Sequence, residues 1–80
     1  MNPAQKSKQA LDAMKSAILE QLAQYPNGAG NSELARVLGL ESDFQGKQKN
    51  YLSWSVLGLL VNEGRVVFEK RAHNVFYRLP

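Results

Sequence analysis

Amide, cationic and aromatic side chains fall on one face of the segment 47–62. If this segment is a helix of about 100° per residue with Leu60 facing inward, its outward half carries a mixed set of side chains. They are Lys47, Gln48, Tyr51, Trp54, Ser55 and Gly58, with Asn50 near the edge of the face. Gln and Asn can form paired hydrogen bonds with adenine, and Lys can reach guanine or a phosphate. We expect the set to contact a nucleic-acid groove, the alternative being a solvated surface.

A second polar and basic cluster lies between two short β-prone runs near the end of the sequence. Its members are Lys70, Arg71, His73 and Asn74. A basic hairpin tip can lie along a phosphate backbone or enter the minor groove, where Arg is favoured. The alternative is a charged turn that keeps an edge hairpin soluble. We expect DNA contact, with His73 as a turn residue or phosphate donor and not a catalyst.

Lys47, Lys49 and Asn50 lie at the start of the expected helix, where free backbone amides and the helix dipole attract phosphate. The letters GKQK superficially resemble a phosphate-binding loop. The spacing that such a loop requires is absent, because Gly39 and Gly46 are too far apart and Gln48 stands where the loop needs a hydroxyl residue. We therefore exclude nucleotide hydrolysis.

Composition limits the chemistry available to the chain. Its 80 residues, 44% hydrophobic, allow one domain with one core. It has no cysteine and one histidine, which excludes a disulfide framework, a thiolate zinc site and a histidine-rich metal site. No carboxylate pair has a persuasive spacing either. We expect no catalysis, no metal and no cofactor.

The net charge of +3 is unevenly placed. Residues 1–44 carry four Lys and Arg against five Asp and Glu, whereas residues 45–80 carry six against two. A basic half of this kind points to a polyanion as partner. No apolar run approaches the roughly 18–20 residues of a membrane span, and no apolar stretch follows the first lysines as in a signal peptide. We expect a cytoplasmic protein.

Apolar spacings of three and four residues predict a first helix. The stripe consists of Leu11, Met14, Ile18 and Leu22. Pro26 restricts the residue before it and ends the helix. Residues 1–8 show no such periodicity, so we expect a flexible N-terminus over 1–8 and a domain over 9–80.

Two further helices and a hairpin follow. A short helix should be capped by Asn31 or Ser32 and end at Gly39. The next ten residues read as a loop in which Ser42 or Asp43 could instead cap a helical turn. The third helix, 47–62, should turn one face inward, comprising Leu52, Ser53, Val56, Leu57 and Leu60, and stop at Gly64. The runs RVVFEK and VFYRL predict a β-hairpin around RAHN, with Asn74 tolerating the turn conformation.

This order of elements predicts an α+β fold, mostly helical: a three-helix bundle with a C-terminal two-stranded β-hairpin. The hairpin would be marginal alone and must pack against the helices. We expect its apolar residues to divide between the core and the other face of the hairpin, with the parity left open. These residues are Val66, Phe68, Val75 and Tyr77.

The run ILEQLAQYPNGAGNSELARVLGL resembles the first two helices of bacterial winged-helix DNA-binding domains. YLSWSVLGLLVNEGRV resembles their recognition helix, and NVFYRL resembles their last wing strand, so the likeness covers residues 15–80. The longer connection before the third helix and the Trp within it are similar to winged helices attached to some restriction endonucleases of the Mrr type. The chain has no nuclease domain, so cleavage does not carry over.

The resemblance implies roles for two more residues. In helix-turn-helix proteins the second helix crosses the DNA backbone, which would bring Ser32 and Arg36 to phosphates. Arg36 could instead pair with Glu33 or Glu41. Trp54 could belong to an interface, but we favour partial burial against the loop 41–46.

Three functions follow from these features. The first is double-stranded DNA binding by a small transcriptional regulator, which could dimerise through its first helix. The second is a protein-interaction module that uses the third helix and the wing, because fold does not dictate function. The third is RNA binding, which needs exposed aromatic side chains on which bases can stack. A continuous positive strip would favour DNA, and an apolar patch would favour a protein partner.

Overall fold

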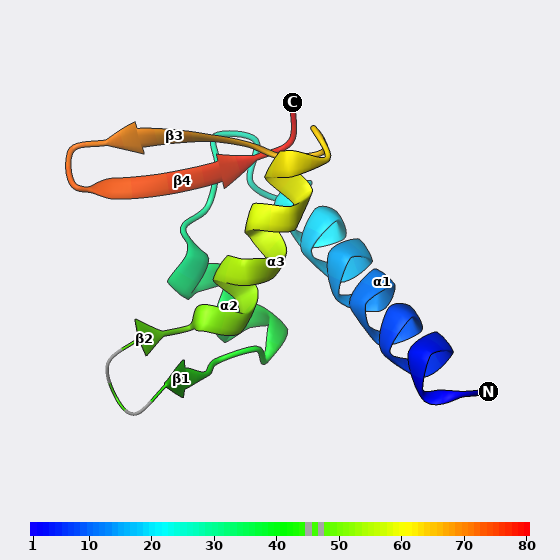
Figure 1. Cartoon of the computed structure of the whole chain (residues 1–80). Helices are drawn as coiled ribbons and strands as arrows, with labels where there is room; N and C mark the ends of the chain where they lie inside the picture. Colours follow the sequence, from blue (N-terminus) through cyan, green and yellow to red (C-terminus); the bar gives the residue numbers. More distant parts are fainter. Residues whose placement is uncertain (45, 47) are drawn as a thin grey trace.

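A computed structural model describes residues 1–44, 46 and 48–80. This part of the chain forms three helices and two antiparallel hairpins (Figure 1). In chain order they are α1 (Pro3–Leu22), α2 (Asn31–Leu38), β1 (Asp43–Phe44), β2 (Gln48–Lys49), α3 (Tyr51–Asn62), β3 (Val67–Arg71) and β4 (Asn74–Arg78). The fold is mixed α+β and mostly helical, as expected. No helix in the described residues is both long and apolar enough to cross a membrane.

Helix α1 begins at Pro3, although we expected residues 1–8 to form a flexible segment. The cause is a capping box. The Oδ1 atom of Asn2 accepts from the backbone amide of Gln5 at 2.8 Å, and the Oε1 atom of Gln5 accepts from that of Asn2 at 3.0 Å. Residues 3–10 are exposed, so this part of the helix is held by its cap and not by packing. Apolar periodicity could not reveal it.

The core lies where the three helices meet the β3–β4 hairpin. Its buried side chains come from every one of these elements: Ile18, Leu22, Ala29, Leu34, Val56, Leu57, Leu60, Val66 and Tyr77. The predicted inward face of α3 is confirmed, with Ser53, Val56, Leu57 and Leu60 buried and Leu52 half-buried.

Helix α2 is capped by Gly30 and not by Asn31 or Ser32. Asn31 is the first helical residue, and its side chain bonds to the start of α3 instead of to its own helix. The helix ends as predicted at Gly39, which has a φ of 69° in the left-handed region that favours glycine.

The β3–β4 hairpin pairs Arg71 with Asn74 around a two-residue loop. The positive φ of this turn, 55°, falls on Ala72, whereas we expected the turn conformation at Asn74. Asn74 is the first residue of β4. On the other edge of β4, Tyr77 forms a bridge to Ala29, in which each backbone amide donates to the other's carbonyl at 2.8 Å. This bridge ties the hairpin to the connection between α1 and α2.

Both hairpins project from the same side of α3 (Figure 1). The β1–β2 hairpin precedes its N-terminal end, and the β3–β4 hairpin follows its C-terminal end. The sequence predicts a loop in place of the β1–β2 hairpin, and the hairpin was missed because its strands are only two residues long.

Candidate nucleic-acid interface

Helix α3 begins at Tyr51, four residues later than expected. Asn50 is its N-cap and has a φ of 57°, which interrupts the helical path. Lys49 and Gln48 therefore belong to β2, not to the helix, and Lys47 lies outside the described residues. The cluster of cations expected on the first helical turn is absent from the described part of α3.

The N-terminus of α3 is capped from a distance by Ser42. Its hydroxyl accepts from the backbone amide of Leu52 at 3.2 Å. The backbone amide of Asn50 donates to the carbonyl of Ser42, and the Oδ1 atom of Asn50 accepts from the amide of Ser42 at 3.4 Å. Ser42 is thus a cap, as one reading of the sequence suggested, but of α3 and across the β1–β2 hairpin.

A partly buried polar junction joins α2 to α3. The Nδ2 atom of Asn31 donates to the carbonyl of Asn50 at 3.0 Å, and the hydroxyl of Ser53 donates to the Oδ1 atom of Asn31 at 2.5 Å. Ser53 is fully buried within an otherwise apolar face. The side-chain amide of Asn50 donates to the hydroxyl of Ser32 at 3.2 Å, so these two predicted contact residues already bond to each other. Sequence analysis missed this network, whose one signal was a serine among the inward positions of α3.

The predicted outward face of α3 is exposed. Trp54 is 61% and Tyr51 40% accessible, and Ser55 and Gly58 are exposed as well. The expectation that Trp54 is partly buried against the loop 41–46 is wrong. The hydroxyl of Ser55 donates to the carbonyl of Tyr51 at 2.9 Å, which leaves its oxygen available as an acceptor.

A hollow of about 290 Å³ lies at the N-terminal end of this face. It is lined by Asn31, Lys49, Tyr51 and Trp54. The Nζ atom of Lys49 lies 3.6 Å from the Oδ2 atom of Asp43, and both side chains are mostly exposed. An exposed pair of this kind is weak, so Lys49 can exchange its partner.

The tip of the β3–β4 hairpin presents Lys70, His73 and Asn74 to solvent. Arg71, which we expected to contact DNA, is engaged within the protein. Its guanidinium donates to the carbonyl of Asn27 and lies 3.1 Å from the carboxylate of Glu69. Because Asn27 is far away in sequence, no local pattern could reveal this contact.

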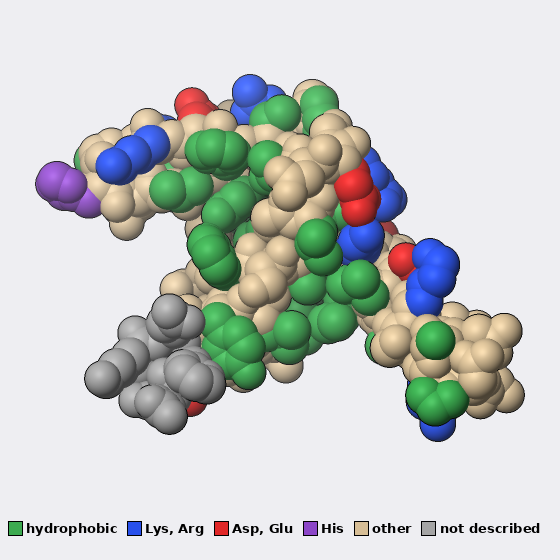
Figure 2. All heavy atoms as spheres, viewed as in Figure 1, with side chains coloured by type: hydrophobic (Ala, Val, Ile, Leu, Met, Phe, Trp, Pro, Cys, Tyr) green, Lys and Arg blue, Asp and Glu red, His purple; other side chains and the backbone are tan. Residues whose placement is uncertain are grey.

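The register of the hairpin fixes the parity that the sequence left open, and the expected division of Phe68, Val75 and Tyr77 between two faces is wrong. Phe68 pairs with Tyr77, and Lys70 pairs with Val75, so these four side chains share the face that meets the helices. Tyr77 is buried, and burial raises the pKa of its hydroxyl. Phe68 and Val75 are 58% and 38% exposed. The hairpin therefore extends beyond the core. Figure 2 shows hydrophobic side chains on the concave surface between the hairpin and α3.

Other cations of the chain differ in how freely they can act. Arg36 is exposed on α2 and pairs with neither Glu33 nor Glu41 among the described residues. Lys15 and Arg65 both pair with Glu63, at 2.6 and 3.4 Å. The hydrogen bond from Lys15, with a smaller contribution from Arg65, holds the pKa of Glu63 below its usual value of 4.5.

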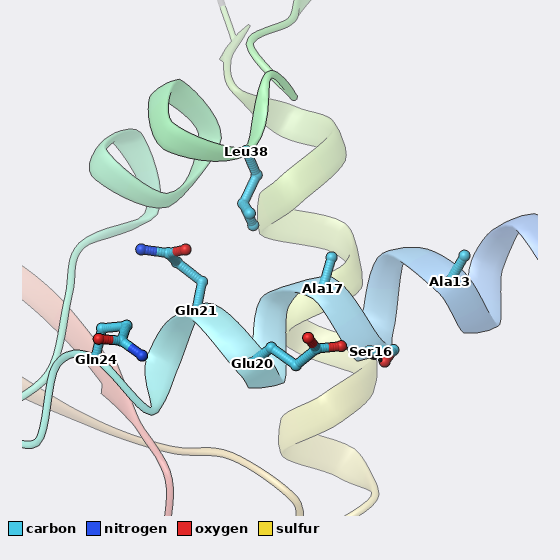
Figure 3. A pocket seen from close by; sticks show the side chains of 7 residues that line it. All are labelled: Ala13, Ser16, Ala17, Glu20, Gln21, Gln24 and Leu38. Carbon is cyan, nitrogen blue, oxygen red and sulfur yellow. Dashed lines mark hydrogen bonds between the residues drawn. The ribbon is translucent and has the colours of Figure 1, made fainter.

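A second, shallow groove of about 600 Å³ lies between α1 and α2 (Figure 3). It is lined by Ala13, Ser16, Ala17, Glu20, Gln21, Gln24 and Leu38. The hydroxyl of Ser16 donates to Glu20 at 3.0 Å, so the one carboxylate of the groove is already bonded. No group of three or more metal-ligating side chains gathers here or elsewhere in the described residues.

Comparison of the chain with protein-family models, with curated proteins and with solved structures gives no match.

Proposed function

We propose that this chain is a winged-helix domain that binds duplex DNA. In this arrangement α3 lies in the major groove, and the β3–β4 hairpin is the wing that follows the backbone or the minor groove. The order of elements supports the proposal, because three helices precede the hairpin and Ala29 adds a third, one-residue strand beside β4. Such domains present one helix to DNA and use the others to hold it.

The observation that carries the proposal is the unpartnered outward face of α3. A helix of 12 residues is about 18 Å long, and the major groove of B-DNA, about 12 Å wide, admits a helix. The small residues Ser55 and Gly58 allow the backbone to approach a groove closely. The two hairpins flank this helix on one side. Lys49 directly precedes its N-terminal end, and Lys70 lies near the tip of the β3–β4 hairpin.

The affinity of this interface should be modest and salt-dependent. Three described cations near α3 and the hairpins are exposed and are either unpaired or only weakly paired. They are Lys49, Lys70 and Arg36. Three phosphate contacts predict a slope of roughly −3 for log K against log salt concentration. A small transcriptional regulator of the cytoplasm would gain affinity by pairing two copies, with α1 as the contact that we propose.

Fluorescence anisotropy of a mixed-sequence duplex tests the proposal. Wild-type protein should bind at low salt and release the duplex as salt rises. Lys70→Ala should weaken binding several-fold and make the salt slope shallower by about one unit. Lys6→Ala is the matched control, because Lys6 is also exposed but lies near the N-terminal end of α1, away from both hairpins (Figure 1). No binding at low salt would overturn the proposal.

The exposed apolar surface favours a second candidate, a protein-interaction module. Trp54 and Phe68 are each more than half exposed, and large exposed aromatic side chains usually mark interfaces. A protein partner would bury this surface without needing Lys70. The absence of duplex binding at low salt would favour this candidate over DNA.

A further inference from the structure

We propose that the hollow at the N-terminal end of α3 binds one unpaired nucleotide of a DNA duplex. The base would stack on Trp54 and Tyr51, and its phosphate would face Lys49. The inference rests on the proposed DNA-binding function and names the form of DNA that the domain prefers.

The size of the hollow suits a single flat group. Its volume, about 290 Å³, lies just below the roughly 300–1,000 Å³ typical of small-molecule sites. The two aromatic residues are one helical turn apart, so their exposed surfaces lie on the same side of α3.

The aromatic side chains supply the stacking surface. Trp54 is the most exposed aromatic side chain of the described residues, at 61%, and Tyr51 is 40% exposed. A nucleobase of any type offers a π-face to such rings, which is how proteins hold single-stranded bases without reading their sequence. An aliphatic ligand would gain area but no stacking.

The polar lining selects an anion that carries such a base. Among the described residues Lys49 pairs only with Asp43, and the pair is exposed, so a phosphate can replace the carboxylate. A cationic ligand, which two aromatic rings could otherwise attract, would be repelled by Lys49. Asn31 is held in place by Asn50 and Ser53, and its amide keeps one further donor and one further acceptor for the edge of a base.

The nucleotide must be unpaired, because both faces of a base inside a duplex are already stacked. Only a base outside the stack can offer its face to Trp54. The hollow lies at the end of α3 that would contact base edges in a helix-turn-helix complex. A nucleotide displaced from the duplex at that point could enter it while the rest of α3 stays in the groove.

The sole tryptophan of the chain makes the test direct, because intrinsic fluorescence reports on Trp54 alone. Three labelled duplexes of one sequence are titrated at low salt: fully paired, with a one-nucleotide bulge, and with an abasic site in place of the bulged base. We expect the bulged duplex to bind about tenfold more tightly than the paired one and to quench the tryptophan. The abasic bulge should do neither.

Variants distinguish stacking from shape. Trp54→Ala should bring the ratio of bulged to paired affinity to about one, and Trp54→Phe should restore part of it. Phe68→Ala, which removes an exposed aromatic ring outside the hollow, should leave the ratio unchanged. Circular dichroism confirms that each variant is folded.

The outcomes separate the two proposals. Equal affinity for the paired and bulged duplexes without quenching would overturn this inference and leave DNA binding intact. Equal affinity for the bulged and abasic duplexes would also overturn it, since the protein would then recognise a bend and not a base. No binding of any duplex would overturn both.

Discussion

The guanidinium of Arg71 in β3 lies 4.1 Å from the centre of the Phe76 ring in the neighbouring strand β4. The sequence had predicted a DNA contact for this guanidinium instead. The same group donates to the carbonyl of Asn27 and pairs with Glu69. Arg71 therefore fastens the hairpin to the connection between α1 and α2, and it acts on the hairpin's position, not as a free cation.

Replacing Arg71 by Ala should destabilise the protein, because a cation–π contact and a hydrogen bond are lost together. We expect a loss of about 1–2 kcal/mol in the free energy of unfolding. Lys70→Ala, at the neighbouring exposed position, should change it by less than about 0.5 kcal/mol. Urea denaturation followed by circular dichroism measures both. Equal stability of the two variants would show that the Arg71 contacts contribute nothing.

Gly28 stands beside the same guanidinium and should not tolerate a side chain. Its φ is +97°, and a Cβ atom there would lie 3.2 Å from the carbonyl oxygen of Tyr77 and 3.1 Å from Arg71. Gly28→Ala should lower the free energy of unfolding by about 2–3 kcal/mol, because it adds both backbone strain and steric crowding. Gly64 has a similar conformation, with φ +73°, but open space around it, so Gly64→Ala isolates the strain at about 1 kcal/mol. Thermal unfolding compares the two, and a smaller loss for Gly28→Ala would contradict the close packing.

The Ser42 cap of α3 predicts a contrast between two serines. Ser42→Ala removes the acceptor for the amide of Leu52 and should destabilise the protein by about 1 kcal/mol. Ser55→Ala changes an exposed helical serine into the better helix former, so stability should stay level or rise by a few tenths of a kcal/mol. Chemical denaturation of the two variants measures these changes. An unchanged free energy of unfolding for Ser42→Ala would show that the Ser42 hydroxyl does not stabilise α3.

Glu63 predicts a dependence of stability on pH. Its pKa is lower in the folded protein than its ordinary 4.5, chiefly because Lys15 donates to it. A lowered folded pKa stabilises the protein above pH 4.5 and loses that contribution as pH falls through the folded value. Glu63→Gln should therefore lower the melting temperature near pH 7 and have little effect at about pH 2.5.

A Lys15→Met background serves as the control for this pH series. Without its main partner, the carboxylate should titrate nearer its ordinary pKa, and Glu63→Gln should then have a smaller effect at every pH. An effect of Glu63→Gln that stays constant from neutral to acidic pH would show that the ion pair is not its source.

The order of the main elements was predictable from spacing alone. Leu60 sets the phase of α3, so the outward position of Tyr51 and Trp54 was predicted correctly even though the start of the helix was not. The start was missed because Asn50 adopts a left-handed conformation, which Asn tolerates but does not require. Asn2 and Gln5 likewise begin α1 through polar contacts that leave no apolar pattern.

The candidate site was less predictable, because charge in a sequence does not reveal partners. Arg71 and Lys70 are neighbouring basic residues in the sequence. Arg71 nevertheless donates to the carbonyl of Asn27, far away in the chain, whereas Lys70 is exposed at the hairpin tip. Trp54 was misjudged because its burial depended on the path of the loop 41–46, which spacing does not determine.

The bridge between Ala29 and Tyr77 sets the order in which the molecule can be completed during synthesis. Helices α1 and α2 leave the ribosome before the hairpin and can form from local contacts, but the strand partner of Ala29, Tyr77, is made after both helices. Until then the apolar face of Ile18 and Leu22 lacks its cover from the hairpin. Closure across most of the sequence is entropically slow, so the nascent chain passes through an interval in which this face is open to chaperones or to other chains.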